Sequence, residues 1–218
     1  MLIVVGGMIG LGKTTLGEIL AEEFNAKMYY ESVDDNPILP LYYTASPEEI
    51  QKNRYPFLLQ LYFLSSRFKA IKNAANHAKD SVSIIDRSIY EDWYFAKINY
   101  DLGRMSDLEF SIYKELLDNM MAEIAEIPKK APDLMVYLKG SFETVVDRIN
   151  SRGRSFELDK DLLDYYRLLW QGYDDWLKDF YKASEVIIIE TDNYNIVNNM
   201  EHRKIVVDMI KDKLTNLK

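Results

Sequence analysis

The stretch from Gly7 to Thr14, which reads GMIGLGKT, constrains the fold more strongly than any other part of the chain. It matches the pattern G-x-x-x-x-G-K-[ST], follows the apolar run of residues 2–5 and precedes a helical pattern that begins near Lys13. Glycines let backbone N–H groups converge on phosphates, and the N-terminus of the following helix adds positive potential. The sequence therefore predicts a strand, a phosphate-binding loop and a helix, in preference to a glycine-rich turn with an incidental lysine.

The side chains of this loop predict a nucleoside triphosphate and Mg²⁺ as the ligands. Lys13 is expected to reach the β- and γ-phosphates, and the hydroxyl of Thr14 is expected to ligate the metal ion. We therefore expect ATP and Mg²⁺ as cofactors. The residues expected to bind the nucleotide in this loop are Gly7, Gly10, Gly12, Lys13, Thr14 and Thr15.

Short apolar runs alternate with longer helical patterns over all 218 residues. This alternation is typical of a parallel sheet covered by helices, and the length suits a single domain over 1–218. We predict an α/β fold of three layers, with a five-stranded parallel sheet covered on both faces, and a surface loop at 42–56. The predicted strands are 2–5, 27–30, 83–85, 134–138 and 186–189. The predicted helices are 14–24, 55–76, 89–100, 107–127, 142–151, 161–181 and 201–217.

Composition narrows the class of protein. The net charge of −8 argues against a general nucleic-acid binder, which needs a broad basic face. The chain has no cysteine for disulfides or thiolate zinc sites, and its two histidines are too few for a His-rich metal site. The N-terminus lacks the basic region of a signal peptide, and no apolar run approaches the ~18 residues of a membrane span. We expect a cytoplasmic protein with a small-molecule substrate, no nucleic-acid partner and no membrane partner.

Charged residues follow two of the predicted strands, at the edge where α/β sheets bind ligands. In DRSIYED, residues 86–92, Asp86 closes an apolar strand and is expected to meet Mg²⁺ near Thr14. The adjacent Arg87 suits a transferring phosphoryl group better than a switch or hydrolase loop, because a guanidinium offsets developing charge. Glu31 ends the second strand and suits a general base for an acceptor hydroxyl, with a strand-end salt bridge as the alternative.

Two further pairs of polar residues have a structural interpretation. Ser88 and Glu91 match the S-x-x-E capping box and need no catalytic role. Gln60 and Arg67 lie seven residues apart on one helix face among apolar neighbours. From this pattern alone we expect both side chains to be solvated.

Three arginines lie close together in RINSRGR. Arg148 and Arg152 share a helix face, Gly153 can end that helix, and Arg154 lies just beyond it. Arginines near a helix C-terminus can complement its dipole. Three of them in seven residues of an acidic chain favour a lid over the phosphates of the nucleotide.

Five motifs in a fixed order give the chain a likeness to a known family, and the likeness runs nearly end to end. The motifs are the phosphate loop, Glu31 at 18 residues after Lys13, FLLQLYFLSSRF, DRSIYED and RINSRGRSFE. The chain resembles the deoxyribonucleoside kinases, and most nearly the bacterial enzymes that phosphorylate deoxyadenosine or deoxyguanosine. The resemblance implies a P-loop kinase-type fold and ATP-dependent 5′-phosphorylation of a deoxynucleoside in nucleotide salvage.

The resemblance also implies catalytic roles. Glu31 would act as general base on the 5′-hydroxyl, and Arg87, with Lys13, would steady the 5′-oxygen and the transferring phosphate. Asp86 would lie near Mg²⁺. The lid would span about 148–157, with Arg148, Arg152 and Arg154 over the ATP phosphates, and Asp192 would belong to the loop around the base of ATP.

Other implied roles concern the substrate and the assembly. Relatives in the family are commonly dimers, so we expect a homodimer or a dimer with a related subunit, which an apolar stripe within 107–127 permits. The residues implied at the nucleobase are Gln60, Arg67 and Asp92. The residues implied at the sugar 3′-hydroxyl are Glu157 and one of Tyr42 and Tyr43, with Tyr43 preferred.

The chemistry of these residues suggests which base is bound. An ionised Asp92 accepts hydrogen bonds from the amine of adenine or cytosine and repels the O4 of thymine. Gln60 can donate one hydrogen bond and accept one, and Arg67 could hold Asp92 ionised or donate to a purine. We expect deoxyadenosine first, followed by deoxyguanosine and deoxycytidine, as substrates.

Two other functions compete with this one. A nucleoside monophosphate kinase of the thymidylate type would need further cations near Glu31, where YYESVDDNP supplies carboxylates instead. A non-catalytic nucleotide-binding partner subunit would lack the general base or the lid, but Glu31, Arg87 and Arg152 are all present.

Overall fold

Five parallel strands form one sheet in the computed structural model, which confirms the predicted sheet. The structure describes residues 1–33, 35–127, 131–154 and 162–217. The strands are β1 (Leu2–Gly7), β2 (Lys27–Tyr29), β3 (Ser83–Asp86), β4 (Leu134–Lys139) and β5 (Glu185–Glu190). They lie in the order β2-β3-β1-β4-β5, and every neighbouring pair is parallel. Val5 in the central strand lies opposite Asp86 on one side and Val136 on the other, so the carboxyl ends of these strands meet at one edge.

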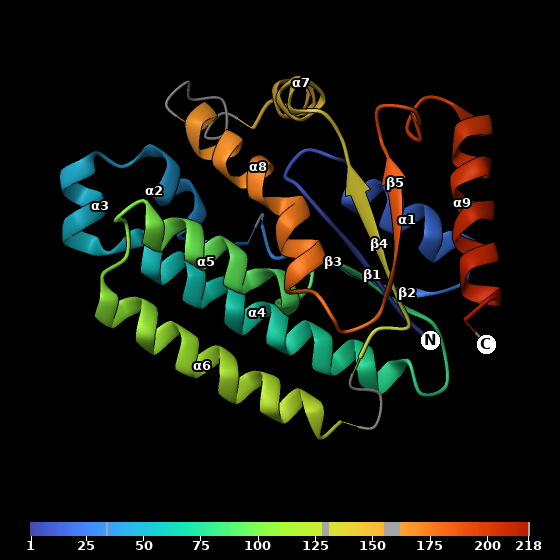
Figure 1. Ribbon diagram of the computed structural model, residues 1–218, viewed down its shortest axis with the longest axis horizontal. Coiled ribbons are helices and arrows are strands. Elements are labelled where there is room, and N and C mark those ends of the chain that lie inside the picture. The colour runs from blue at the N-terminus through green and yellow to red at the C-terminus, as the bar shows by residue number, and fades with distance from the viewer. Residues whose placement is uncertain (34, 128–130, 155–161, 218) are drawn as a thin grey trace.

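Helices cover both faces of this sheet, which confirms the three-layer fold (Figure 1). The described helices are α1 (Lys13–Glu23), α2 (Leu39–Thr44), α3 (Pro47–Asn53), α4 (Tyr55–His77), the 3-10 turn η1 (Ile89–Glu91), α5 (Asp92–Asp101), α6 (Asp107–Ala125), α7 (Phe142–Arg152), α8 (Leu163–Asp179) and α9 (Met200–Thr215). In Figure 1, α1 and α9 lie on one side of the sheet and α4, α5 and α8 on the other. α6 packs outside α4 and α5. None of the described helices is long and apolar enough to cross a membrane.

The segment 42–56 is helical, so the prediction of a surface loop there is wrong. It contains the end of α2, all of α3 and the start of α4. Ser46 caps α3: its hydroxyl accepts a hydrogen bond from the Glu49 N–H at 3.3 Å, and its own N–H donates to the Glu49 carboxylate at 2.9 Å. Pro47 follows at the start of the helix, where its missing N–H costs no hydrogen bond. Proline and polar residues here begin a helix instead of forming a loop.

The main core is built on the sheet, and a smaller apolar cluster lies apart from it. All six residues of β1 are buried, as expected for the central strand of a covered parallel sheet. On α6, whose stripe was predicted to be apolar, Phe110, Tyr113, Leu117 and Ile124 are buried, whereas Leu116 is exposed. Most of that stripe therefore belongs to the core.

Candidate active site

The phosphate loop joins β1 to α1 as the sequence predicts. Gly7 has a φ of +130°, and a Cβ added there would lie 2.4 Å from the carbonyl oxygen of Leu138, so the site tolerates glycine alone. Lys13 folds back over the loop, and its Nζ donates to the carbonyl oxygen of Met8 at 3.0 Å. Burial, followed by the charge of Arg87, lowers the pKa of Lys13 to about 8. Phosphate oxygens would give this buried ammonium group better partners than one carbonyl oxygen.

Thr14 and Asp86 meet beside the loop, at the position that we predicted for a metal ion. The Thr14 hydroxyl donates to one oxygen of the Asp86 carboxylate. The other oxygen, Oδ1, is buried and has no hydrogen-bond partner among the described residues. Burial, with the nearby charge of Glu31, raises the pKa of Asp86. A hydroxyl and a carboxylate with an unused oxygen fit a hard cation such as Mg²⁺, which binds few protein ligands and keeps phosphate and water oxygens.

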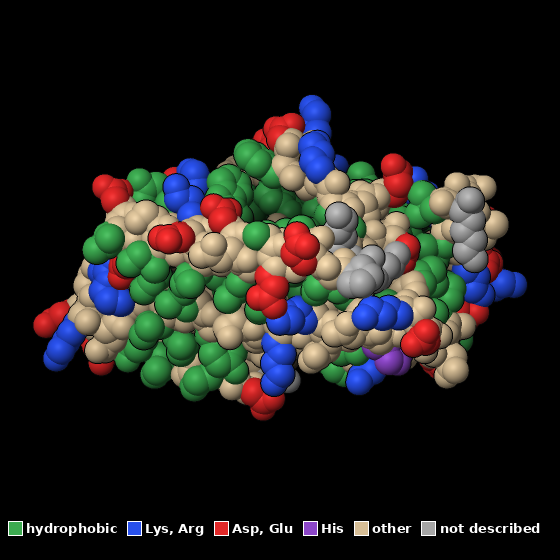
Figure 2. Space-filling model, turned by 90° about the horizontal axis from the view of Figure 1, so that it is seen from below, with side chains coloured by type: hydrophobic (Ala, Val, Ile, Leu, Met, Phe, Trp, Pro, Cys, Tyr) green, Lys and Arg blue, Asp and Glu red, His purple; other side chains and the backbone are tan. Residues whose placement is uncertain are grey.

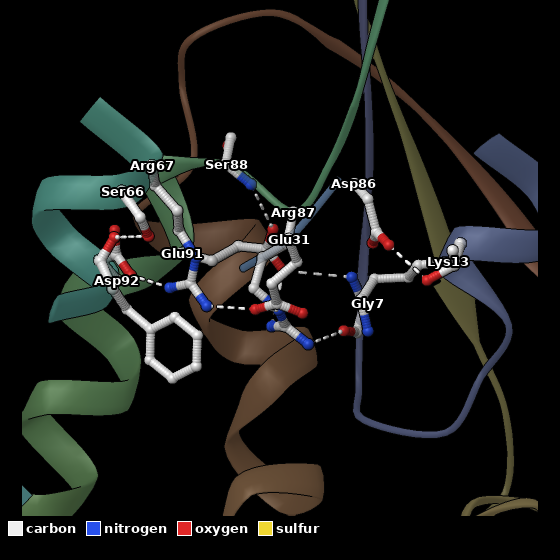
Figure 3. A network of polar contacts seen from close by, with 12 residues as sticks. Gly7, Lys13, Glu31, Ser66, Arg67, Asp86, Arg87, Ser88, Glu91 and Asp92 are labelled. Atoms are coloured by element: carbon white, nitrogen blue, oxygen red, sulfur yellow. Dashed lines mark hydrogen bonds and ion pairs between the residues drawn. The ribbon is translucent and has the colours of Figure 1, made fainter. Parts of the chain in front are cut away.

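Glu31, just beyond β2, lies between two arginines (Figure 3). Arg67 from α4 forms an ion pair with its Oε1, and Arg87 approaches the same oxygen with Nε at 3.1 Å. Burial alone would raise the pKa of this carboxyl, but the charges of Arg87, Arg67 and Lys13 outweigh burial and lower the pKa to about 2. Glu31 is therefore ionised at any physiological pH. The strand-end salt bridge that was the alternative for Glu31 exists, and it lies inside a pocket.

Arg87 is held in an unusual backbone conformation at the end of β3. Its φ is +58°, in the left-handed region that residues other than glycine adopt at a cost. Its N–H donates to the carbonyl oxygen of Val5 at 3.0 Å, which ties it to the central strand. The side chain is buried, with the guanidinium 4.6 Å from the ring centroid of Phe95 and NH2 3.0 Å from the carbonyl oxygen of Gly7. Local strain kept at a ligand-facing position is typical of functional sites.

A pocket, here called the inner pocket, opens beside Glu31. Gln60 and Arg67 lie on its wall and are both buried, so the expectation from the pattern alone that they are solvated is wrong. About 620 Å³ of space, part of it open to solvent, lies between its walls. Its lining includes Glu31, Leu59, Gln60, Phe63, Arg67 and Phe95.

Asp92 lies behind Arg67 and not on the wall of the inner pocket. It begins α5, is fully buried, and forms an ion pair with the Arg67 guanidinium. The sequence grouped Asp92 with Gln60 and Arg67 at the nucleobase. The structure brings Asp92 to Arg67, but only Gln60 and Arg67 are among the residues that line the pocket.

Both candidate tyrosines line the inner pocket. The hydroxyl of Tyr42 donates to Asn99 Oδ1 at 2.8 Å and accepts from Arg104 NH1 at 2.8 Å. Tyr42 is therefore anchored in the wall, and the role of Tyr43 at the sugar stays a prediction. Asn99 and Arg104 were not identified from the sequence. Glu157, the other residue predicted at the sugar, lies outside the described residues.

A wider groove, here called the outer groove, runs along the phosphate loop. It holds about 2300 Å³ of open space, and its lining includes Gly10, Gly12, Thr14, Thr15, Arg148 and Asp192. Arg148 donates to the carbonyl oxygens of Leu11 at 2.9 Å and Thr191 at 3.0 Å, so it fastens the loop to the end of β5. The Asp192 carboxylate accepts from the Ser141 N–H at 2.8 Å, before the start of α7. Both predicted residues thus lie where a nucleotide on the loop would extend.

The groove and the pocket meet around Lys13, Glu31, Arg152 and Arg154, which line both. A triphosphate in the groove would point its last phosphate toward an acceptor in the pocket, between one carboxylate and several cations. A carboxylate can take a proton from an attacking hydroxyl, and cations can stabilise the transferring group. Fold and site together define a P-loop phosphotransferase with a small-molecule acceptor.

Comparisons with known proteins narrow this class. Residues 3–215 match the family model for deoxynucleoside kinase. The chain is 45% identical over 215 residues to a deoxyguanosine kinase of Lactobacillus acidophilus, covering 97% of this chain and 90% of the relative. It is 44% identical over 218 residues to a deoxyadenosine kinase of the same species, covering 99% of this chain and 97% of that relative. A solved deoxyadenosine kinase of M. mycoides with the products dCMP and dCDP bound is 26% identical, with a TM-score of 0.78 and full coverage of both chains.

The chain therefore belongs to the deoxynucleoside kinase family. It is an enzyme that transfers a phosphoryl group from a nucleotide to a deoxynucleoside. The resemblance of the five sequence motifs to this family is confirmed over nearly the whole chain.

The low pKa of Glu31 predicts a specific acid sensitivity. Its folded-state pKa of about 2 lies below the ordinary value of 4.5, so the unfolded chain binds a proton here first and stability falls as pH falls from about 5 toward 2. Glu31→Gln should make the free energy of unfolding less steep in pH by up to about one proton per molecule. Urea unfolding at several pH values measures this slope. Equal slopes for wild type and Glu31→Gln would contradict the prediction.

Proposed function

We propose that this chain transfers the γ-phosphoryl group of ATP to the 5′-hydroxyl of a purine deoxynucleoside, deoxyadenosine or deoxyguanosine, in nucleoside salvage. The observation that carries the proposal is the position of Glu31, ionised between Arg67 and Arg87 where the inner pocket meets the outer groove. The deoxynucleoside occupies the inner pocket, and ATP lies along the outer groove.

Glu31 accepts the proton of the 5′-hydroxyl as that oxygen bonds to the γ-phosphorus and ADP departs. A carboxylate with a pKa of about 2 is a weak base for a free alcohol. In a loose phosphoryl-transfer transition state, however, the hydroxyl gives up its proton late, when bonding to phosphorus has made it acidic. Glu31 therefore acts first by orienting the hydroxyl for attack and only then by taking the proton.

Cations around the junction balance the charge of the transferring group. Lys13 leaves the carbonyl oxygen of Met8 for the β- and γ-phosphates, because its ammonium group binds a charged phosphate oxygen more strongly than a neutral carbonyl oxygen. Arg87 steadies the 5′-oxygen, and Arg152 and Arg154 add positive charge where the pocket and the groove meet. The unpaired oxygen of Asp86 and the hydroxyl of Thr14 would hold Mg²⁺, which would neutralise part of the phosphate charge during transfer.

Arg67 and Gln60 support a purine base. Arg67 lies in the pocket wall, and its ion pair with Asp92 fixes the guanidinium there. The N–H groups of the guanidinium suit the acceptors N7 of a purine or O6 of guanine. Gln60 lines the pocket, and its amide can donate to and accept from one edge of adenine. Contact between Asp92 and the base amine, expected from the sequence, requires Arg67 to move aside. The similarity to a deoxyguanosine and a deoxyadenosine kinase also favours purines.

Substrate preference tests the proposal. With labelled ATP and Mg²⁺, deoxyadenosine or deoxyguanosine should be phosphorylated with a kcat/KM at least about 100-fold above that for thymidine, since unpaired polar groups in a pocket are costly. Removing Mg²⁺ with a chelator should abolish transfer. A panel of the four deoxynucleosides and their 5′-monophosphates measures both effects. Preference for thymidine would refute the base assignment, and preference for a monophosphate acceptor would indicate the monophosphate kinase alternative.

We also propose that the exposed face of α6 binds a second copy or a related subunit. Leu108 is 69% exposed, and Ile112 and Leu116 are exposed one and two turns further along. Figure 2 shows this side of the molecule with apolar side chains gathered on one half. Exposed apolar patches of this kind are typical of interaction sites.

Sedimentation velocity checks the assembly. The wild type should sediment as a dimer, and Ile112→Glu should sediment as a monomer because a charge would be buried at the interface. Met200→Glu is the matched control, since Met200 is 70% exposed at the start of α9, away from α6. A monomeric wild type, or dimers in all three proteins, would contradict an interface on α6.

A further inference from the structure

Arg87 is held from behind by two residues outside the inner pocket and the outer groove. Its NH1 donates to the hydroxyl of Tyr173 at 2.7 Å and lies 3.3 Å from Oε1 of Glu91. The Tyr173 hydroxyl in turn donates to the same Glu91 oxygen. Glu91 ends η1 and Tyr173 lies in the middle of α8. Neither side chain lines the pocket or the groove, so neither is placed to contact substrate or nucleotide.

Glu91 connects Arg87 to the first glycine of the phosphate loop (Figure 3). Its Oε1 accepts from the Gly7 N–H at 3.2 Å, while the Gly7 carbonyl oxygen accepts from Arg87 NH2 at 3.0 Å. The three residues thus form a closed ring of hydrogen bonds between the ends of β1 and β3. Arg87 Nε, on the other edge of the guanidinium, faces Glu31. A displacement of this ring would move Arg87 relative to both the loop and the general base.

The capping box predicted from Ser88 and Glu91 is present, but it does not explain the burial of Glu91. The cap uses Oε2, which accepts from the Ser88 N–H at 3.3 Å. The residue is nevertheless 0% exposed. A capping carboxylate functions well at the surface, whereas a buried one is costly unless it is paired. Here Oε1 faces a guanidinium, a phenol and a backbone N–H, which indicates a second role for Glu91.

We propose that Tyr173 and Glu91 are positioning residues that fix the Arg87 guanidinium in the orientation needed for phosphoryl transfer. The proposal rests on the role of Arg87 given under the proposed function. If the Tyr173 hydroxyl is removed, Arg87 keeps its charge but loses the shorter of the two hydrogen bonds made by its NH1 group. Transfer depends on placing cations closely around the moving phosphoryl group, so the rate constant suffers, whereas binding of either substrate does not.

Tyr173→Phe tests this with the smallest change. It keeps the ring, which packs 5.1 Å from Tyr94 between centroids, and removes only the hydroxyl. kcat should fall about 10-fold or more, while KM for the deoxynucleoside and for ATP changes less than about threefold. Tyr94→Phe is the matched control: it lies at the same interface of α5 and α8 and loses a hydrogen bond to the Leu169 carbonyl oxygen, without contacting Arg87. It should lower the melting temperature slightly and leave kcat unchanged.

A double-mutant cycle shows whether Tyr173 acts through Arg87. In an Arg87→Lys background, which lacks the NH1 edge, Tyr173→Phe should lower kcat less than about twofold further, because coupled residues are not additive. The proposal would be overturned if Tyr173→Phe lowered kcat by the same factor in wild type and in Arg87→Lys. It would also be overturned if Tyr173→Phe lowered kcat no more than Tyr94→Phe does. If Tyr173→Phe fails to fold, Glu91→Gln, which can still cap Ser88, provides the same cycle. Full activity of Arg87→Lys would refute the proposed role of Arg87 itself. If Arg87→Lys loses activity but Tyr173→Phe does not, only the positioning role of Tyr173 is refuted.

Discussion

The carboxylate of Glu31 lies between two arginines, and the rest of the site depends on how that charge is balanced. Burial favours a neutral carboxyl, but Arg67 and Arg87 keep it ionised. Each arginine has a further carboxylate behind it, Asp92 for Arg67 and Glu91 for Arg87. Buried charges are tolerable only when each is paired, and this row of alternating charges pairs them all. The enzyme can therefore keep an ionised base in the wall of the inner pocket.

The order of the strands explains why these groups meet. β2, β3 and β1 are neighbours, and Glu31, Arg87 and the phosphate loop follow their carboxyl ends. Parallel sheets bind ligands at this edge because side chains and backbone groups of successive connections converge there. α4 and α5 then supply Arg67 and Asp92, and α8 supplies Tyr173. The strand ends thus supply the phosphate loop, Glu31 and Arg87, and the helices packed against the sheet supply residues that pair with Glu31 and Arg87.

The features that the sequence predicted correctly have local signals. The phosphate loop is one contiguous motif, and the three inner strands, β1, β3 and β4, appear as apolar runs because they are buried on both faces. The burial of Arg67 has no local signal, since its partners Asp92 and Glu31 lie 25 and 36 residues away. Glu91 looks like an ordinary cap until packing places Tyr173, 82 residues away, beside it. Pairings of this kind depend on tertiary structure, so local patterns predicted solvated side chains and a simple cap.

Glu31→Gln tests most directly the claim that the charge of Glu31 serves transfer. The substitution keeps the size of the side chain and removes its charge, so the single-turnover rate of phosphoryl transfer should fall by about 10²–10⁴-fold. The dissociation constant of the deoxynucleoside, measured by calorimetry, should change less than about threefold. An unchanged rate, or a loss of binding as large as the loss of rate, would contradict the account, because Glu31 would then only maintain the shape of the pocket.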